Sequence, residues 1–202
     1  MKFTFLAMAL AGFSSVAAAQ TNTFDFINAT YVNLKVDDID LNATGAGLEA
    51  SKLLTDNIYL HGSYFSVSDS DSDDGFSAKL TADEIKLSVG YRYTLGENTD
   101  WYAQVGYISQ EIDLAISSAA INFRESGSAD GFLLKTGLKH SWDMFEGGVY
   151  VEHADLSGDD DGGSTYFGVD GRFKFNEKFH LVASFATGSD EDYIKFGLSY
   201  AF

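Results

Sequence analysis

Hydrophobic and polar residues alternate along most of this chain with the period of two that is typical of β-strands. In EIKLSVGYRYTL, residues 84–95, every second residue from Ile85 to Leu95 is apolar, whereas the intervening residues include Glu84, Lys86 and Arg92. Nine further segments show the same alternation, some more weakly: 24–36, 42–54, 57–68, 101–107, 131–142, 147–155, 165–175, 179–186 and 193–202. The pattern predicts ten strands, each with one apolar and one polar face.

The connections between these segments are of two kinds. Short turns occupy residues 55–57, 96–100, 143–146 and 176–178, and they carry ordinary hairpin residues. A second set holds most of the acidic residues and is usually longer: 37–40, 68–83, 111–130, 155–163 and 190–192. The two kinds alternate strictly along the chain, which predicts an up-and-down meander whose two ends lie in different surroundings.

Such strands can form either a soluble β-sandwich or a closed membrane barrel. Aromatic residues gather near the ends of the apolar faces, as in the interfacial girdles of outer-membrane barrels, and Trp101 and Trp142 are examples. A strand of about ten residues tilted by about 40° spans about 25 Å, the height of an outer-membrane apolar band. The last strand ends on Phe202 with no polar tail. We therefore expect an all-β, closed, antiparallel barrel of ten strands, with eight strands and the soluble secreted sandwich as alternatives.

The first residues resemble an export signal. Lys2 is followed by an apolar run, and Ala17 and Ala19 provide a small-residue cleavage motif. We therefore divide the chain into a signal peptide, 1–19, and a barrel domain, 20–202. No stretch after the signal is long and apolar enough for a membrane-spanning helix.

Composition narrows the class further. The chain has no cysteine and no proline, which excludes disulfides and suits long hydrogen-bonded strands. Its formal net charge is −17, and loss of Lys2 with the signal would make it −18. So acidic a chain is not expected to bind nucleic acid, because phosphate binding requires a basic surface.

Closure into a barrel turns the polar face of every strand inward. The alternation then places these charged residues in the lumen: Glu49, Glu84, Lys86, Arg92, Lys135, Lys139, Glu152, Asp170, Arg172, Lys174 and Lys195. Tyr59, His61, Tyr102, Gln104 and His180 are expected between them. Charges in a membrane barrel must be paired or hydrated. If the lumen conducts, its basic surplus favours anions.

The ending FGLSYAF, together with the signal, the alternation and the asymmetry of the connections, resembles the small Gram-negative outer-membrane β-barrels of the OmpA transmembrane-domain and OmpX type. The resemblance covers essentially the whole mature chain. It implies a location in the cell outer membrane, contact with outer-membrane lipid and lipopolysaccharide, and delivery by periplasmic chaperones. It also implies an assembly signal read by the outer-membrane insertion machinery, whose positions match Phe196, Leu198, Tyr200 and Phe202.

Ten-stranded barrels of this kind include the omptin proteases, so an enzyme is an alternative. His153 and Asp155, at the outer end of a strand, resemble the residue types that omptins use. A general base requires an orienting partner and a cleft, and the strands look too short to build walls above the membrane. His140 and Ser141 face opposite sides of one strand, which excludes a nucleophile–base pair, and His140 is expected beside Trp142.

The acidic run at Asp69, Asp71 and Asp73 spaces its carboxylates as a calcium loop does. However, Asp74 takes the place of the required glycine and Leu80 that of the final glutamate. We therefore predict no metal site, no catalytic residue and no cofactor.

The segment Glu111 to Asp130 alternates again, and it can extend two strands as a hairpin above the membrane. Its exposed edge could add a strand to the sheet of an extracellular protein. The leading hypothesis is thus a non-enzymatic outer-membrane barrel, either a narrow porin-like channel or a structural and surface-interaction protein with acidic extracellular loops. A barrel-embedded enzyme that acts on peptide or lipid is the alternative.

Overall fold

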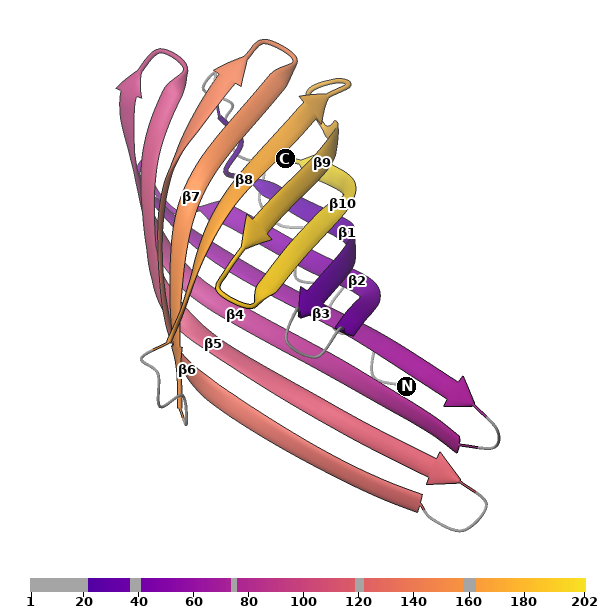
Figure 1. The fold of residues 1–202 in the computed structure, drawn as a ribbon. Helices are drawn as coiled ribbons and strands as arrows, with labels where there is room; N and C mark the ends of the chain where they lie inside the picture. The colour runs from indigo at the N-terminus through magenta and orange to yellow at the C-terminus, as the bar shows by residue number, and fades with distance from the viewer. Residues whose placement is uncertain (1–21, 37–40, 74–75, 119–121, 158–162) are drawn as a thin grey trace.

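The computed structural model describes residues 22–36, 41–73, 76–118, 122–157 and 163–202. The predicted signal peptide, 1–19, lies outside these residues. Ten strands form the fold (Figure 1). Their bounds are β1 Phe26–Val36, β2 Leu41–Leu53, β3 Ile58–Asp73, β4 Phe76–Gly96, β5 Thr99–Ser118, β6 Asn122–Trp142, β7 Phe145–Leu156, β8 Ser164–Lys174, β9 Phe179–Thr187 and β10 Glu191–Ala201.

The strands close into a barrel in which each strand pairs antiparallel with the next. β10 returns to β1, with register from Phe26 opposite Ala201 to Val36 opposite Glu191. This pairing confirms ten strands rather than eight, and it confirms β1 as the partner of the terminal strand. The soluble sandwich is wrong, because the sheet closes on itself. Among the described residues, no helix is long and apolar enough to cross a membrane.

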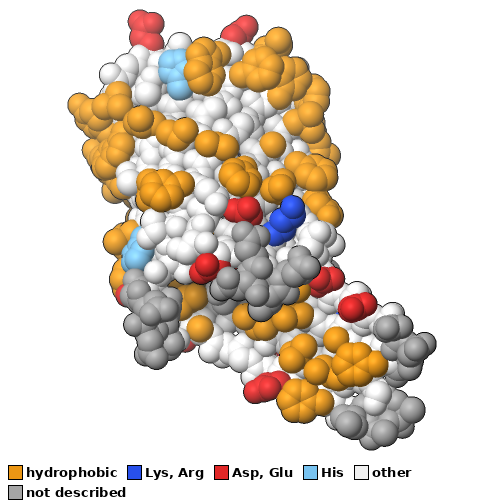
Figure 2. Space-filling view, in the orientation of Figure 1, with side chains coloured by type: hydrophobic (Ala, Val, Ile, Leu, Met, Phe, Trp, Pro, Cys, Tyr) orange, Lys and Arg blue, Asp and Glu red, His pale blue; other side chains and the backbone are white. Residues whose placement is uncertain are grey.

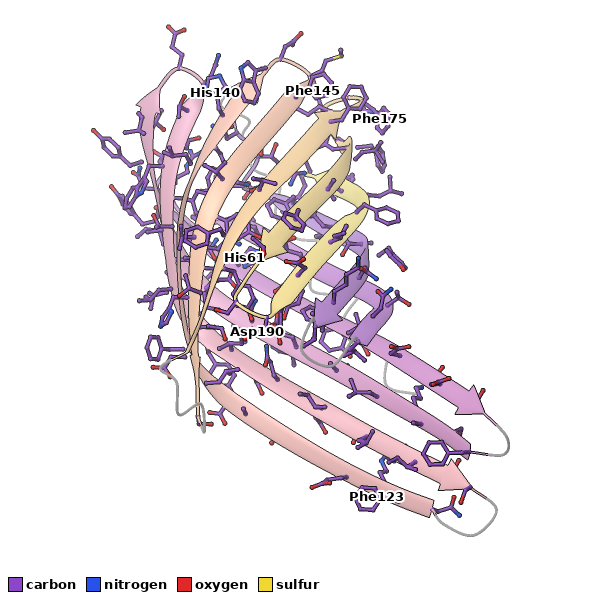
Figure 3. The ribbon with its side chains drawn as sticks, viewed as in Figure 1. His61, Phe123, His140, Phe145, Phe175 and Asp190 are labelled. Atoms are coloured by element: carbon purple, nitrogen blue, oxygen red, sulfur yellow. The ribbon has the colours of Figure 1, made fainter. Side chains whose placement is uncertain are left out.

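The two ends of the barrel differ. Residues 54–57, 97–98, 143–144 and 175–178 connect strands at one end, which we call the turn end. The opposite end, where residues 37–40, 74–75, 119–121, 157–163 and 188–190 lie between strands, is the loop end. Phe145 and Phe175 mark the turn end in Figure 3, and Asp190 and Phe123 lie toward the other.

The outward face of the barrel is apolar and exposed. Leu87, Phe167 and Leu198 are about 60% exposed, although each is large and hydrophobic. On β4 this face runs from Ile85 to Leu95, about 33 Å of strand, or about 25 Å of height at a tilt of roughly 40°. Figure 2 shows these side chains around the barrel wall. So large an apolar surface requires a hydrophobic environment.

Four strands continue beyond the rest at the loop end, at the lower right of Figure 1. Pairing of β2 with β3 stops at Ser68, and pairing of β6 with β7 begins only at Gly131. Beyond these points β3, β4, β5 and β6 pair with one another alone among the described residues. We call residues 67–73, 76–82, 112–118 and 122–127 the distal sheet, which starts at the last residues of β3 that pair with β2, Val67 and Ser68.

The distal sheet confirms one prediction and corrects two. The Glu111 to Asp130 segment extends β5 and β6 as expected. The acidic stretch 68–83 was predicted as a connection, but residues 68–73 are the end of β3 and residues 76–83 are the start of β4. In the second of these, Phe76, Ala78, Leu80 and Ala82 alternate with polar residues. The expectation that the strands are too short to build walls beyond the apolar band is therefore also wrong.

Smaller corrections concern strand ends. β1 begins at Phe26 rather than Phe24. Asp100, Glu146 and Glu191, predicted in connections, belong to β5, β7 and β10. These three residues lie next to turns, where the alternation of apolar and polar residues is hard to recognise. The barrel interior therefore contains carboxylates that the sequence prediction did not place there.

Candidate functional site

The middle of the barrel interior is an ion-pair network. Lys86 lies 3.0 Å from a carboxylate oxygen of Glu84 and 2.7 Å from one of Glu152, and Lys135 lies 3.3 Å from the other oxygen of Glu152. Glu84 and Glu152 are buried. Because each buried carboxylate faces an ammonium group, the charges offset one another in an environment that would penalise either alone.

A second group of inward contacts joins β1, β2 and β3. His61 Nε2 is 2.8 Å from Glu49 Oε1, and Asn28 donates to the other oxygen of Glu49 at 3.1 Å. Lys195 projects inward from β10, with its ammonium 5.0 Å from the ring centre of Phe65. The interior is therefore held by hydrogen bonds, ion pairs and cation–π contacts between strands that are distant in sequence.

Glu146 is the centre of a second cluster nearer the turn end. Its carboxylate lies 3.7 Å from Lys139, 3.7 Å from Arg172 and 3.5 Å from Lys174, and its side chain is almost fully buried. Sequence analysis assigned Glu146 to a turn and missed it. The signal was available, because Glu146 shares the parity of Tyr150 and Glu152 on β7.

The chain before β1 folds into the turn end of the lumen. Asn22 is fully buried and donates to Asp100 Oδ2 at 2.8 Å, and the main-chain N–H of Thr23 donates to Glu146 Oε2 at 2.8 Å. Phe24 is buried against Tyr59, with ring centres 5.1 Å apart. Residues 22–25 thus form a segment, here called the N-terminal plug, that fills the turn end of the barrel.

The plug is also tied to the wall. Asp25 accepts the main-chain N–H of Leu53 at 2.6 Å and pairs with Lys52 at 3.1 Å. The guanidinium of Arg92 lies 5.1 Å from the ring centre of Phe24. Asn22, Phe24 and Asp25 therefore contact the barrel wall through their side chains, and Thr23 does so through its main chain.

Inward-facing tyrosines fill the lumen by lying over glycines. Tyr59, Tyr102 and Tyr150 each face a glycine directly opposite on the next strand, namely Gly90, Gly137 and Gly168. A Cβ built on any of these three glycines would overlap the facing tyrosine. The rings occupy the space that a side chain would otherwise take, as in the aromatic rescue of sheet glycines.

An apolar cluster lies in the interior toward the loop end. Val32, Phe65, Val67 and Tyr193 are nearly inaccessible and pack together with Tyr166. The ring of Tyr193 lies 5.9 Å from that of Phe65 and 5.6 Å from that of Tyr166. Tyr166 and Tyr193 also both donate to Glu191 at 2.8 Å, which fixes their orientation. We call this group the loop-end cluster.

A cavity of about 160 Å³ lies within the interior. Nine of the predicted lumen charges line it: Glu49, Glu84, Lys86, Lys135, Lys139, Glu152, Asp170, Arg172 and Lys195. Arg92 and Lys174 lie instead at the turn end, where Arg92 Nε donates to the carbonyl of Asp56 and Lys174 donates to Ser141. The cavity has room for a small group of water molecules.

The charge balance of the interior differs from the predicted one. Asp100, Glu146 and Glu191 add inward carboxylates that the sequence prediction did not count. Asp25 and Lys52 pair with each other beside the plug. The predicted surplus of seven basic over four acidic residues therefore disappears, because the three added carboxylates equal it.

The four histidines lie at separate places in the barrel. His153 accepts or donates a hydrogen bond with Thr165 at 2.9 Å, and it shares the outward parity of Val149 and Val151 on β7, as does Asp155. His140 lies beside Trp142, as predicted, with ring centres 4.4 Å apart and tilted ring planes. His180 lies inside, 3.2 Å from Arg172 Nη1. No group of three metal-ligating side chains is found among the described residues.

The predicted assembly-signal residues lie on the outer surface of the last strand. Phe196 and Leu198 are more than half exposed, and Tyr200 stacks on Phe202 with ring centres 6.3 Å apart. The main-chain N–H of Phe202 donates to the carbonyl of Asp25 at 3.3 Å. The two ends of the barrel domain therefore meet beside the plug.

A closed ten-stranded antiparallel barrel with an apolar outside and a charged inside is the architecture of transmembrane β-barrels. The chain matches no protein-family model and no curated protein sequence. It is similar in structure to the outer membrane protease OmpT of Escherichia coli, with TM-score 0.55, 12% identity, and coverage of 91% of this chain and 100% of that one. It is also similar to a KdgM porin solved in complex with disordered oligogalacturonate, with TM-score 0.50, 11% identity, and coverage of 87% and 99%.

At these identities the likeness concerns the fold. The chain has the fold of Gram-negative outer-membrane β-barrels, as the sequence resemblance implied. A protease and a porin share this fold, so the fold alone assigns neither activity.

Proposed function

We propose that this chain is an exported, non-enzymatic outer-membrane barrel that acts as a structural and surface-interaction protein. In this proposal, residues 1–19 direct export, the turn end faces the periplasm and the loop end faces the exterior. Outer-membrane lipid and lipopolysaccharide surround the wall, and the insertion machinery and periplasmic chaperones handle the chain before it inserts.

The observation that carries the proposal is the distal sheet. Below it, the outward positions of β3 to β6 are apolar and include Tyr64, Ile85 and Phe132. Within it, the outward positions become polar, and Asp113 pairs there with Arg124 at 3.3 Å while Ser77 bonds Ser117 at 2.8 Å. A face that changes from apolar to polar along one strand supports a sheet that leaves the membrane and stands in water.

The side chains that occupy the barrel interior favour a surface-interaction role over a transport role. The N-terminal plug and the loop-end cluster lie at opposite ends of the charged network. Barrels of about this size are filled by side chains, whereas wide aqueous channels need many more strands. A narrow porin-like channel would have to pass both groups.

The residues that suggested the enzyme alternative do not lie in the lumen. His153 and Asp155 share a parity that faces away from the lumen. We therefore expect no turnover of peptide or lipid A, and we expect His153→Ala and Asp155→Ala to behave as the unmodified chain does. Turnover that both substitutions abolish would establish the enzyme instead.

The proposed partner is an extracellular protein that contacts the distal sheet, which contains most of the Glu111 to Asp130 hairpin. Within the described part of the chain, residues 122–129 of β6 pair only with β5, so one edge of the sheet is open to a partner.

Cysteine labelling tests the arrangement directly, because the chain has no cysteine of its own. Single variants Ser70→Cys and Ser126→Cys place a thiol in the distal sheet, and Asn176→Cys places one at the turn end. In intact cells, a membrane-impermeant maleimide should label the first two and spare the third. Labelling of Asn176→Cys alone would overturn the proposed orientation.

A further inference from the structure

The inner face of the distal sheet is apolar along its two central strands, and we call this apolar strip the trough. It is built by alternate residues of two central strands, with Phe76, Ala78, Leu80 and Ala82 from β4 and Ile112, Leu114 and Ile116 from β5; Phe123 joins them from β6. Phe76, Ile112 and Phe123 are each about half exposed. Figure 2 shows apolar side chains on this part of the molecule, and Figure 3 places Phe123 toward its far end.

Contacts with the barrel core show which side of the distal sheet these apolar residues occupy. Phe65 and Val67 point inward and belong to the loop-end cluster, and Ala82, opposite Val67, packs against it. Residues that face one another across antiparallel strands point to the same side of the sheet. The row Leu80, Leu114 and its neighbours therefore continues the interior face of the barrel beyond its mouth.

Acidic residues border the trough on both sides. Asp69 and Asp71 lie on β3, and Glu125 lies on β6. In the register of the sheet, Asp69, Leu80, Leu114 and Glu125 form one row across the four strands. The described positions of this face include no lysine or arginine.

We propose that the trough binds a cationic amphipathic helix of a partner protein. Three strand spacings of about 4.8 Å separate the two acidic borders by about 14 Å, and a helix with its side chains is about 10–12 Å wide. An apolar stripe on the helix would lie on β4 and β5, while lysines or arginines on either flank would meet the acids. The trough from Ile112 to Ser118 is about 20 Å long, which matches about 13 helical residues.

The acids also favour this occupant over lipid. An apolar surface beside a membrane could take up acyl chains, but outer-membrane head groups are anionic and the borders of the trough are anionic too. The polar outer face of the sheet already supports its separation from the bilayer. The inference rests on the proposed surface role and specifies which partner chemistry that surface selects.

The test uses a 14-residue peptide of leucine and lysine, with leucines at i, i+3, i+4 and i+7 spacing, and a matched peptide in which glutamate replaces every lysine. Both peptides carry a dye, and their binding to the full-length mature protein in phosphatidylcholine nanodiscs is measured by fluorescence anisotropy against empty nanodiscs. Heat-modifiable gel mobility checks that every variant is folded.

Two pairs of variants separate the trough from the rest of the surface. Leu114→Gln alters the trough, and Ala115→Gln makes a similar change on the outer face of the same strand. The triple variant Asp69→Asn, Asp71→Asn, Glu125→Gln removes the acidic borders. Its control, Glu111→Gln, Asp113→Asn, Asp130→Asn, removes three acids from the outward face.

We expect the lysine peptide to bind the unmodified protein above the empty-nanodisc level. Leu114→Gln and the border triple variant should each weaken this binding at least tenfold, and both controls should change it less than twofold. The proposal is overturned by equal binding of the glutamate peptide, by equal effects of Leu114→Gln and Ala115→Gln, or by no binding beyond that of empty nanodiscs.

This experiment is independent of the labelling experiment. Peptide binding by purified protein does not depend on which way the barrel faces in the cell. If labelling contradicts the orientation while the peptide binds, only the proposed function fails; if labelling succeeds while no peptide binds, only the trough proposal fails.

Discussion

The side-chain nitrogen of Asn22 lies 2.8 Å from a carboxylate oxygen of Asp100, so the chain before β1 is bonded to the start of β5, four strands away around the barrel. The N-terminal plug is therefore part of the packed interior. Its contacts, together with the buried charges beside it, lead to predictions about stability and assembly.

Phe24→Ala should destabilise the barrel. Phe24 is 2% exposed and packs on Tyr59, and removal of a buried phenylalanine side chain costs about 3–5 kcal/mol. Urea unfolding in detergent micelles measures the change. Thr23→Ala is the control, because Thr23 contributes its main-chain N–H to Glu146 and keeps it when the side chain is shortened. Equal stability of the two variants would show that Phe24 does not anchor the plug.

Glu146→Gln should destabilise the turn end of the interior. The substitution leaves Lys139, Arg172 and Lys174 facing a neutral amide, and removal of one partner from a buried charge cluster costs about 3–5 kcal/mol. Glu97→Gln, in an exposed turn, should change the free energy of unfolding by less than about 0.5 kcal/mol. If Glu146→Gln unfolds at the same urea concentration as Glu97→Gln, the cluster does not stabilise the barrel.

Gly90→Ala should destabilise the fold through steric overlap. The new methyl group would meet the ring of Tyr59, whose movement is restricted by Phe24, and overpacking of this kind costs about 1–3 kcal/mol. Gly171→Ala is a matched control, because a Cβ at Gly171 meets nothing within 4 Å. If the two variants unfold at the same denaturant concentration, the tyrosine-over-glycine packing is contradicted.

Phe202→Ala should impair assembly more than it alters the finished barrel. Phe202 lies at the end of the outer face of β10 and stacks on Tyr200, where the resemblance places the residue read by the insertion machinery. We expect less heat-modifiable protein in the outer-membrane fraction of cells. Phe175→Ala, which removes another exposed aromatic at the turn end, should assemble normally. If Phe202→Ala assembles as well as the unmodified protein, Phe202 is not part of an assembly signal.

The wall of the barrel could be predicted from sequence because lipid and lumen impose opposite chemistry on alternate residues. The segment 84–95 shows this most clearly, and Lys86 and Ile85 lie on the faces that its alternation assigned. The strand prediction was less accurate wherever the apolar face of a strand does not point outward. In residues 76–82 the apolar parity shifts to the inner face, and the acids opposite them gave the stretch the composition of a loop.

The contents of the lumen could not be predicted to the same extent. Glu146 follows a turn, so its inward direction depends on where β7 begins. The N-terminal plug has no alternation, and the contact of Asn22 with Asp100 exists only once ten strands have closed. Such contacts depend on the closed three-dimensional arrangement, which local sequence patterns do not encode.

The central claim is that the N-terminal plug and the loop-end cluster obstruct the lumen, so that the barrel does not conduct. Planar-bilayer recording of the folded, mature protein tests this claim most directly. The structure predicts a flat trace with no discrete conductance steps in 1 M salt. Regular, long-lived steps of uniform size from heat-modifiable protein would contradict it and would establish a channel through the charged lumen.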